Sequence, residues 1–306
     1  MADEGFSVVT GAFGYSGKYI ARRLLAQGKR VRTLTAHPDR PNPFGDQVSV
    51  APLDFAKPDE LARSLDGAEV LYNTYWIRFA YGRLTFAQAI ENSRILFRAA
   101  QQAGLRRIVH VSITNPSADS PLPYFSGKAE VEQALTKLPL THAILRPTVI
   151  YGAEDILINN IAWIVRRFPV LAVPGSGQCR LQPVFVEDMA ALAVEAGGGD
   201  DNVVTNAVGP EVFTFDELVR LIARTVGRKA RLLHLPPGVA LALSEIVGKL
   251  VGDVVLTADE VAGLAQDLLV VDTPPTGTTR LSDWLAQNAE TVGRRYASEL
   301  QRHFRS

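Results

Sequence analysis

The sequence predicts an α/β fold, with a doubly wound parallel sheet and a smaller, mostly helical C-terminal lobe. Three observations lead to this fold class. Short apolar runs alternate with helical segments in the first half of the chain, a glycine-rich turn follows the first run, and the alternation stops after Tyr151–Gly152. Strands and helices that alternate at this spacing form right-handed βαβ units around a sheet that is buried on both faces.

The elements of the alternating part follow one another at regular spacing. We expect strands at residues 6–10, 30–35, 48–53, 69–74, 107–112 and 141–145, and helices at residues 16–27, 58–65, 86–103 and 129–138. Gly104 ends the third of these helices as a C-cap.

The second part of the chain has a different rhythm. We expect helices at residues 158–167 and 187–196, a loop at 174–177, and strands at 182–186 and 202–207. Two Thr-x-x-Glu capping boxes, Thr214–Glu217 and Thr257–Glu260, open further helices, and residues 280–304 have the pattern of one long amphipathic helix. The predicted domains are residues 1–153 with 182–209, which bind the dinucleotide, and residues 154–181 with 210–306, which form the substrate-side lobe.

Composition gives no sign of a nucleic-acid partner. The 306 residues hold 32 basic and 32 acidic side chains. Cys179 has no partner for a disulfide, and the five histidines lack ligand spacing, so no metal site is predicted. The apolar run at residues 239–252 is too short to span a bilayer, and residues 1–5 do not have the pattern of a signal peptide. We therefore expect a cytoplasmic protein.

Gly11, Gly14 and Gly17 form a G-x-x-G-x-x-G turn between the first strand and the first helix. Gly11 permits a tight turn, Gly14 lets the backbone approach a pyrophosphate, and Gly17 lets the helix pack closely on the strand. The helix N-terminus then offers free N–H groups to the phosphates. The turn predicts a dinucleotide-binding domain of the Rossmann type.

The residues after the second strand favour NADP(H) over NAD(H). An acid at this place holds the ribose 2′-hydroxyl, whereas a basic group accommodates a 2′-phosphate. No carboxylate stands at Thr35, and His37 and Arg40 follow closely. The alternative is that Asp39 and Arg40 are solvated turn residues with no role in binding the cofactor.

Together these features resemble the short-chain dehydrogenase/reductase superfamily over residues 6–210, in its extended or atypical branch. That branch includes epimerase/dehydratase-like proteins and the nucleotide-binding accessory subunit of complex I. The resemblance implies an adenine contact at Leu53-Asp54, a family asparagine at Asn92 and a nicotinamide-binding backbone within Arg146–Gly152. The predicted cofactor-binding residues are Thr10, Gly11, Gly14, Tyr15, Ser16, Gly17, His37, Arg40, Leu53, Asp54, Asn73, Thr74, Tyr75, Lys128, Pro147, Thr148 and Val149.

The family's catalytic signature, Tyr-x-x-x-Lys, matches Tyr124 and Lys128, and Glu132 follows at a further acidic position. Residues four apart share one face of a helix, and a nearby ammonium favours the phenolate. The family's Ser or Thr, which holds the substrate carbonyl, aligns with Ile113. Ser112 or Thr114 could substitute, or both hydroxyls could satisfy local backbone groups.

An aromatic segment, Tyr75–Phe79, follows the fourth strand. Tyr75, Trp76 and Phe79 could wall an apolar or planar substrate site, with Arg78 meeting a polar or anionic group, or they could close the interface between the lobes. We expect the apolar run at residues 239–252 to enclose the substrate with them. Near the C-terminus a solvated helix face is expected at Arg294, Arg295, Arg302 and Arg305.

The predicted function is NAD(P)-dependent oxidoreduction, with hydride transfer at a carbonyl or alcohol centre of a small, partly apolar substrate. Tyr124 would transfer the proton, and Lys128 would orient the ribose and tune Tyr124. The alternatives are a sugar-nucleotide epimerase or dehydratase, and a non-catalytic scaffold that holds NADPH. Association with a second copy or with a membrane complex stays open.

Overall fold

The computed structural model describes residues 5–303. The chain forms two compact units, residues 1–147 with 189–206 and residues 148–188 with 207–306. The sequence-based domain limits fall at residues 153, 182 and 209, close to these divisions.

The first unit contains a seven-stranded sheet in the order β11-β6-β5-β4-β1-β2-β3. Neighbouring strands from β3 to β6 pair in parallel. The order reverses direction at β1 and β4, which places the carboxyl ends of these strands at the topological switch point, where such sheets bind ligands. The predicted fold class is confirmed. The strands are β1 (Phe6–Thr10), β2 (Val31–Thr35), β3 (Val48–Pro52), β4 (Ala68–Asn73), β5 (Arg107–Val111), β6 (Thr141–Pro147) and β11 (Val203–Ala207).

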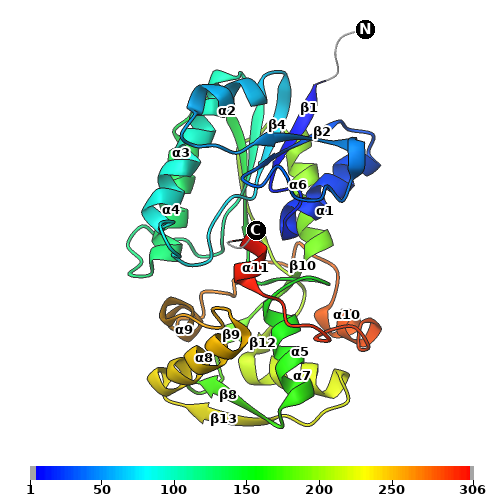
Figure 1. Ribbon diagram of the computed structural model, residues 1–306, viewed down its shortest axis with the longest axis vertical. Coiled ribbons are helices and arrows are strands. Elements are labelled where there is room, and N and C mark those ends of the chain that lie inside the picture. Colours follow the sequence, from blue (N-terminus) through cyan, green and yellow to red (C-terminus); the bar gives the residue numbers. More distant parts are fainter. Residues whose placement is uncertain (1–4, 304–306) are drawn as a thin grey trace. The chain divides into compact units, whose positions relative to one another are not determined.

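Helices cover both faces of this sheet (Figure 1). One face carries α2 (Pro58–Leu65), α3 (Phe86–Gln102) and α4 (Pro123–Thr136), and the other carries α1 (Tyr15–Ala26) and α6 (Val186–Gly198). A short 3-10 helix, η1 (Gly45–Gln47), precedes β3. Buried aliphatic side chains of the central strands pack against α2, α3 and α4, which explains why these strands are continuous apolar runs.

The helix α4 begins at Pro123, six residues before the predicted start at Ala129. Proline suits the first helical position because its φ is already helical and its missing N–H has no partner there. The earlier start has a functional consequence: Tyr124 and Lys128 both lie on α4.

The second unit is mostly helical. Its helices are α5 (Leu157–Arg167), α7 (Phe215–Thr225), α8 (Pro237–Val251), α9 (Ala258–Ala265), α10 (Leu281–Gln287) and α11 (Glu299–His303). Short strand pairs join β7 (Ile150–Tyr151) to β10 (Val184–Phe185), β9 (Arg180–Leu181) to β12 (Phe213–Thr214), and β8 (Val170–Pro174) to β13 (Arg231–Leu235). Both predicted capping boxes are present, at the starts of α7 and α9.

Two predictions in this part of the chain were wrong. The strand expected at residues 182–186 is reduced to Val184–Phe185, because Val186 already opens α6. The long helix expected at residues 280–304 is two short helices separated by a turn in which Gly293 has a φ of +69°. The Asp253 carboxylate accepts the backbone N–H of Glu299 and Leu300 and so fixes the start of α11.

The expected solvated arginine face is therefore not one surface. Arg294 is exposed and pairs with Glu290 at 2.9 Å, whereas Arg302 donates to the backbone carbonyl of Glu154. Arg305 lies outside the described residues.

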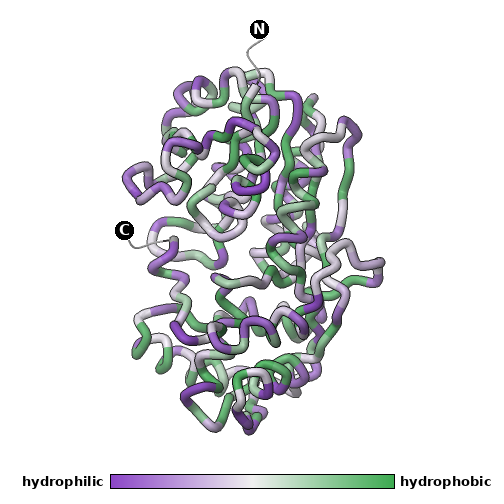
Figure 2. The backbone as a smooth tube through the Cα atoms, turned by 90° about the vertical axis from the view of Figure 1, so that its right-hand side faces the viewer, coloured by the Kyte–Doolittle hydropathy of each residue, from purple (hydrophilic) through white to green (hydrophobic). Residues whose placement is uncertain are grey.

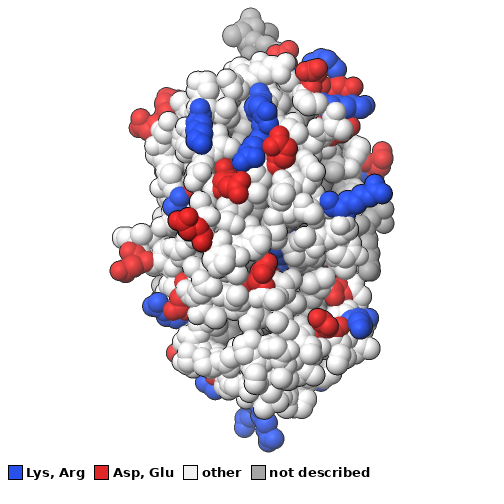
Figure 3. Space-filling model, turned by 90° about the vertical axis from the view of Figure 1, so that its left-hand side faces the viewer, with Lys and Arg blue, Asp and Glu red and all other residues white. Residues whose placement is uncertain are grey.

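Charged side chains of both signs are interspersed on the face shown in Figure 3, as the balanced composition leads one to expect. Hydrophobic and hydrophilic segments alternate along the backbone (Figure 2). Within residues 5–303, every helix is too short or too polar to cross a membrane.

Candidate cofactor and catalytic site

The glycine turn after β1 has the geometry that a pyrophosphate needs. Gly11 has a φ of +64°, and its carbonyl accepts the N–H of Gly14 at 2.8 Å. A Cβ at Gly17 would lie 2.3 Å from the Gly11 oxygen, so the helix packs too closely for any side chain there. A Cβ at Gly14 would meet only that oxygen, at 3.1 Å, which leaves the remaining space open to a ligand.

The start of α1 adds to this fit. Gly14 is the N-cap residue and supplies no side chain to the first N–H groups, and the first turn of the described helix, which includes Tyr15 and Ser16, carries no acid. Unsatisfied N–H groups and the positive end of the helix dipole attract an anion. These residues fit the diphosphate of a dinucleotide.

A buried polar network joins the carboxyl ends of β1, β4 and β5. Thr74 donates its hydroxyl to the carbonyl of Thr10 and its N–H to the Thr10 hydroxyl, both at 2.7 Å. The Thr10 hydroxyl donates to the Asn73 side-chain oxygen at 3.2 Å, and the Asn73 amide lies 3.0 Å from His110 Nδ1. Thr10, Asn73 and Thr74, all predicted at the cofactor, thus hold one another in place beside the glycine turn.

No function was predicted for His110 from the sequence. Because the Asn73 amide nitrogen can only donate, Nδ1 of His110 accepts and the ring proton sits on Nε2. Complete burial, and secondarily the Lys128 charge, hold the pKa of His110 well below its ordinary value, so the ring is neutral. A histidine among the apolar residues Ile108, Val109 and Val111 is the one sequence signal that could have identified it.

The residues expected at the adenosine end follow β2 and β3. His37 donates its N–H to the Thr35 hydroxyl at 3.1 Å, and the Arg40 N–H reaches the His37 carbonyl at 3.2 Å. Leu53 is buried, and Asp54 accepts the N–H of Ala56 at 3.0 Å in a local turn. The residue at the end of β2 in this described segment is Thr35, which is not an acid.

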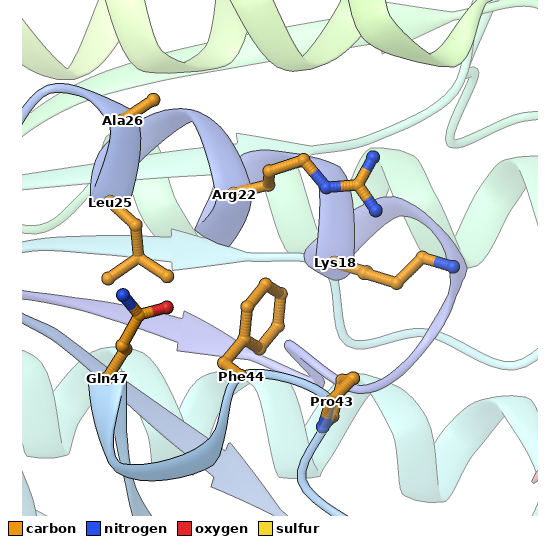
Figure 4. A pocket seen from close by; sticks show the side chains of 7 residues that line it. All are labelled: Lys18, Arg22, Leu25, Ala26, Pro43, Phe44 and Gln47. Atoms are coloured by element: carbon orange, nitrogen blue, oxygen red, sulfur yellow. The ribbon is translucent and has the colours of Figure 1, made fainter.

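A pocket of about 390 Å³ lies between α1 and the loop that follows β2. Figure 4 shows Lys18, Arg22 and Pro43 toward one end, Phe44 in the middle, and Leu25 and Gln47 at the other end. Two of the lining side chains are cationic and, among the described residues that line it, none is acidic. The pocket therefore favours an anionic group.

Tyr75 turns away from the catalytic signature. Its ring packs on Phe55 with centroids 4.9 Å apart, and its hydroxyl accepts from the Asn92 amide at 2.8 Å. Burial raises the pKa of Tyr75 despite this hydrogen bond. Asn92, predicted from the family resemblance, thus positions a residue of the β4 end.

Trp76 occupies the face of α4 that carries the catalytic signature. Its ring lies edge-on to the Tyr124 ring, with centroids 6.0 Å apart, and the Lys128 Nζ stands 4.7 Å from the indole centroid. A Cβ at Gly127 would lie 3.1 Å from the indole, so the helical glycine makes room for it. The close approach explains a residue that otherwise destabilises a helix.

Lys128 is buried, with its Nζ donating to the Val111 carbonyl at 2.9 Å. Burial lowers the pKa of its ammonium to about 7, while Glu132 acts in the opposite direction. The Arg146 guanidinium donates to both oxygens of the Glu132 carboxylate, at 3.0 Å to Oε1 and 2.5 Å to Oε2. Lys128 can therefore change protonation state near neutral pH.

Ser112 and Thr114 follow β5, and each extends the ladder to β6 through its N–H, Ser112 to Leu145 and Thr114 to Pro147. The two residues are 3% and 0% exposed, and neither hydroxyl has a hydrogen-bond partner among the described residues. The alternative that both hydroxyls satisfy local backbone groups is therefore wrong. Ile113 is buried as well.

Thr148 and Val149, which belong to the predicted nicotinamide-binding backbone, lie in the second unit. The Thr148 hydroxyl donates to the carbonyl of Gln182, and the Val149 carbonyl accepts the N–H of Val184 at 2.8 Å. The cofactor contacts of Thr148 and Val149 stay a prediction.

Comparison with known proteins identifies the family. A model described as NAD(P)H-binding matches residues 11–157. A ceramide reductase from Caulobacter vibrioides is 31% identical over 247 residues, which cover 78% of this chain and 76% of that protein. The chain belongs to the NAD(P)H-binding family of atypical short-chain dehydrogenases/reductases.

Two further proteins show the range of this NAD(P)H-binding family and fold. The mitochondrial NADH dehydrogenase (ubiquinone) 1 alpha subcomplex subunit 9 of Arabidopsis thaliana is 27% identical over 285 residues, covering 87% of this chain and 71% of that protein. The structure of an NADPH-dependent quinone oxidoreductase from Escherichia coli, complexed with NADPH, has a TM-score of 0.76 at 21% identity, covering 92% of this chain and 99% of that one. The second likeness concerns the fold alone.

Proposed function

We propose that this family member is an NADP(H)-dependent oxidoreductase that acts at the carbonyl or alcohol carbon of a small, partly apolar substrate. The observation that carries the proposal is the pair of buried hydroxyls of Ser112 and Thr114, which lack partners among the described residues. A buried polar group without a partner destabilises the fold by about 1–3 kcal/mol. A substrate oxygen would accept from such a hydroxyl.

The remaining roles follow from α4. The Tyr124 hydroxyl gives or takes the proton, and Lys128 holds a positive charge close to the reacting groups when it is protonated. The nicotinamide cofactor supplies or accepts hydride when it is bound, and the protein supplies orientation and a dry environment. Thr10, Asn73 and Thr74 keep the rim of the cofactor site rigid.

The preference for NADP(H) rests on charge. Thr35 supplies no carboxylate, His37 and Arg40 follow it, and Lys18 and Arg22 line the pocket that faces the same loop. A 2′-phosphate has cations within reach here, whereas a ribose 2′-hydroxyl has no acid from Thr35 to bind it.

A scaffold that holds NADPH without catalysis is the second candidate. Two observations favour it: the Lys128 ammonium already donates to the Val111 carbonyl, and Trp76 covers this face of α4. The similarity to a subunit of NADH dehydrogenase points in the same direction.

Tyr124→Phe separates the two functions. The variant keeps the ring and its packing but lacks the phenolic proton, so we expect turnover to fall about 10²–10⁴-fold with cofactor affinity unchanged. The measurement is steady-state kinetics on a panel of aldehydes, ketones, alcohols and sugar nucleotides, with cofactor affinity from calorimetry. Absence of turnover across the panel, with cofactor loss in Lys128→Met, would favour the scaffold. Turnover confined to sugar nucleotides would favour an epimerase or dehydratase.

A further inference from the structure

Within the aromatic segment Tyr75–Phe79, Trp76 contacts both residues of the catalytic signature. Ile77 and Phe79 are buried in the core, and Tyr75 is turned onto Phe55. Trp76 instead reaches α4. A ligand that lies beside Tyr124 on this face of α4 would therefore meet Trp76.

Trp76, Phe86 and Tyr124 form an aromatic triangle. The three centroid distances are 6.1 Å for Trp76–Phe86, 6.0 Å for Trp76–Tyr124 and 6.1 Å for Phe86–Tyr124. Each of the three side chains is only half-buried. All three belong to the first unit, so the triangle is independent of where the second unit lies. Rings at this spacing offer edges and faces to a further planar group.

Hydrogen-bond donors accompany these rings. The indole Nε1 of Trp76 is buried and, like the hydroxyls of Ser112 and Thr114, has no partner among the described residues. Because an indole N–H can only donate, it requires an acceptor. The Lys128 Nζ links these groups, since it stands over the Trp76 ring and bonds to the carbonyl of Val111, the residue before Ser112. Buried donors without acceptors are rare in folded proteins, and each of them calls for an acceptor such as a ligand oxygen.

We propose that the aromatic triangle binds the substrate and that the substrate is a planar, conjugated carbonyl compound. The ring system of the compound contacts Trp76, Phe86 and Tyr124, and its carbonyl oxygen accepts from the unpartnered donors. The proposal rests on the proposed function only in calling the ligand a substrate, because binding is measurable without turnover.

The test compares two ketones of similar size, 2-acetylnaphthalene and its saturated counterpart 2-acetyldecalin. Calorimetric titration of the protein saturated with NADP⁺ gives both dissociation constants. We expect the planar ketone to bind about tenfold more tightly, because each aromatic contact contributes roughly two- to tenfold beyond the area it buries. Equal affinities, or binding of the planar ketone only without NADP⁺, would overturn the proposal, since the latter would make the triangle part of the cofactor site.

Variants then locate the site. Trp76→Leu should abolish the preference for the planar ketone, Trp76→Phe should retain most of it, and Phe86→Leu should reduce it about threefold. Trp163→Phe is the matched control, because Trp163 packs on Tyr296 in the second unit. The Trp76→Phe variant covers the case in which Trp76→Leu does not fold. A preference that survives in the Trp76→Leu protein, or is lost in the Trp163→Phe protein, would contradict the assignment.

Binding and turnover are separable outcomes. Tight binding through Trp76 with no reduction of any ketone would support this inference and refute the proposed oxidoreductase. Reduction of the saturated ketone as fast as the planar one would support the oxidoreductase and refute this inference.

Discussion

Lys128→Met should stabilise the protein while it removes the residue assigned to orient the cofactor. The ammonium is buried, and burial lowers its pKa from 10.5 to about 7. At 1.36 kcal/mol per pH unit, this difference corresponds to roughly 5 kcal/mol of unfavourable burial at a pH where the lysine is charged in both states. Methionine has similar length and no charge, so the variant avoids this penalty.

The sign of the pH dependence follows from linkage. Between pH 7 and 10.5 the unfolded chain keeps the proton on Lys128 and the folded chain has released it, so the unfolded state binds more protons. Stability from this group therefore rises with pH in that window and is constant below it. Between pH 6 and pH 9 the gain is about 2–3 kcal/mol.

Urea unfolding at pH 6 and pH 9 measures this effect. We expect the Lys128→Met variant to lack the rise between the two pH values and to exceed the wild type in stability most clearly at pH 6. Lys137→Met is the control, because Lys137 caps the other end of α4 and is exposed. If Lys128→Met shows the same pH dependence as the wild type, Lys128 stays charged in the folded protein and the reasoning fails.

Three further predictions concern the cofactor and the hydroxyls. Gly14→Val should abolish dinucleotide binding in calorimetry with a native circular dichroism spectrum, because the open space above Gly14 would be filled; unchanged affinity would remove the pyrophosphate assignment. Arg40→Ala should weaken NADPH binding about ten- to a hundredfold and leave NADH nearly unchanged, whereas tighter binding of NADH than NADPH by the wild type would reverse the preference. Ser112→Ala should leave the free energy of unfolding unchanged or higher, since it deletes an unpartnered hydroxyl, and lower kcat/KM about tenfold or more; a loss of stability would indicate a structural role.

Much of the fold could be predicted because the strands are apolar runs that the helices bury on both faces. The glycine turn is equally local, since Gly11 and Gly17 have conformational and packing requirements that only glycine meets. The start of α4 could not be predicted in this way. Gly127 is unfavourable in an isolated helix, and only the contact with Trp76, 51 positions earlier in the chain, explains it.

The candidate site shows the same limit. The sequence identified Tyr124, Lys128 and the two hydroxyls, but it could not show that Trp76 rather than Tyr75 contacts Tyr124 and Lys128. Side-chain direction at the end of β4 depends on long-range partners, here Phe55 and Asn92 for Tyr75. The role of His110 was missed for a similar reason, because its partner Asn73 lies on a neighbouring strand.

The register of β5 explains why isoleucine stands where the family has a hydroxyl. The N–H groups of Ser112 and Thr114 extend the ladder to β6, so the chain stays extended past Val111 and its side chains alternate between the two faces. Ile113 falls on the same side as Val109 and Val111, which are all buried and apolar.

The side chains of His110, Ser112 and Thr114 lie on the opposite side of β5 and its extension from Ile113. Each of the three has a buried polar atom without a partner among the described residues. The His110 ring packs against Phe97 of α3, which assigns this side to the face that α4 also covers. Lys128 on α4 reaches the same strand through the Val111 carbonyl. The departure at Ile113 therefore leaves hydroxyls on the side of the catalytic signature. A scaffold would gain stability by replacing them with apolar side chains, so their presence favours catalysis.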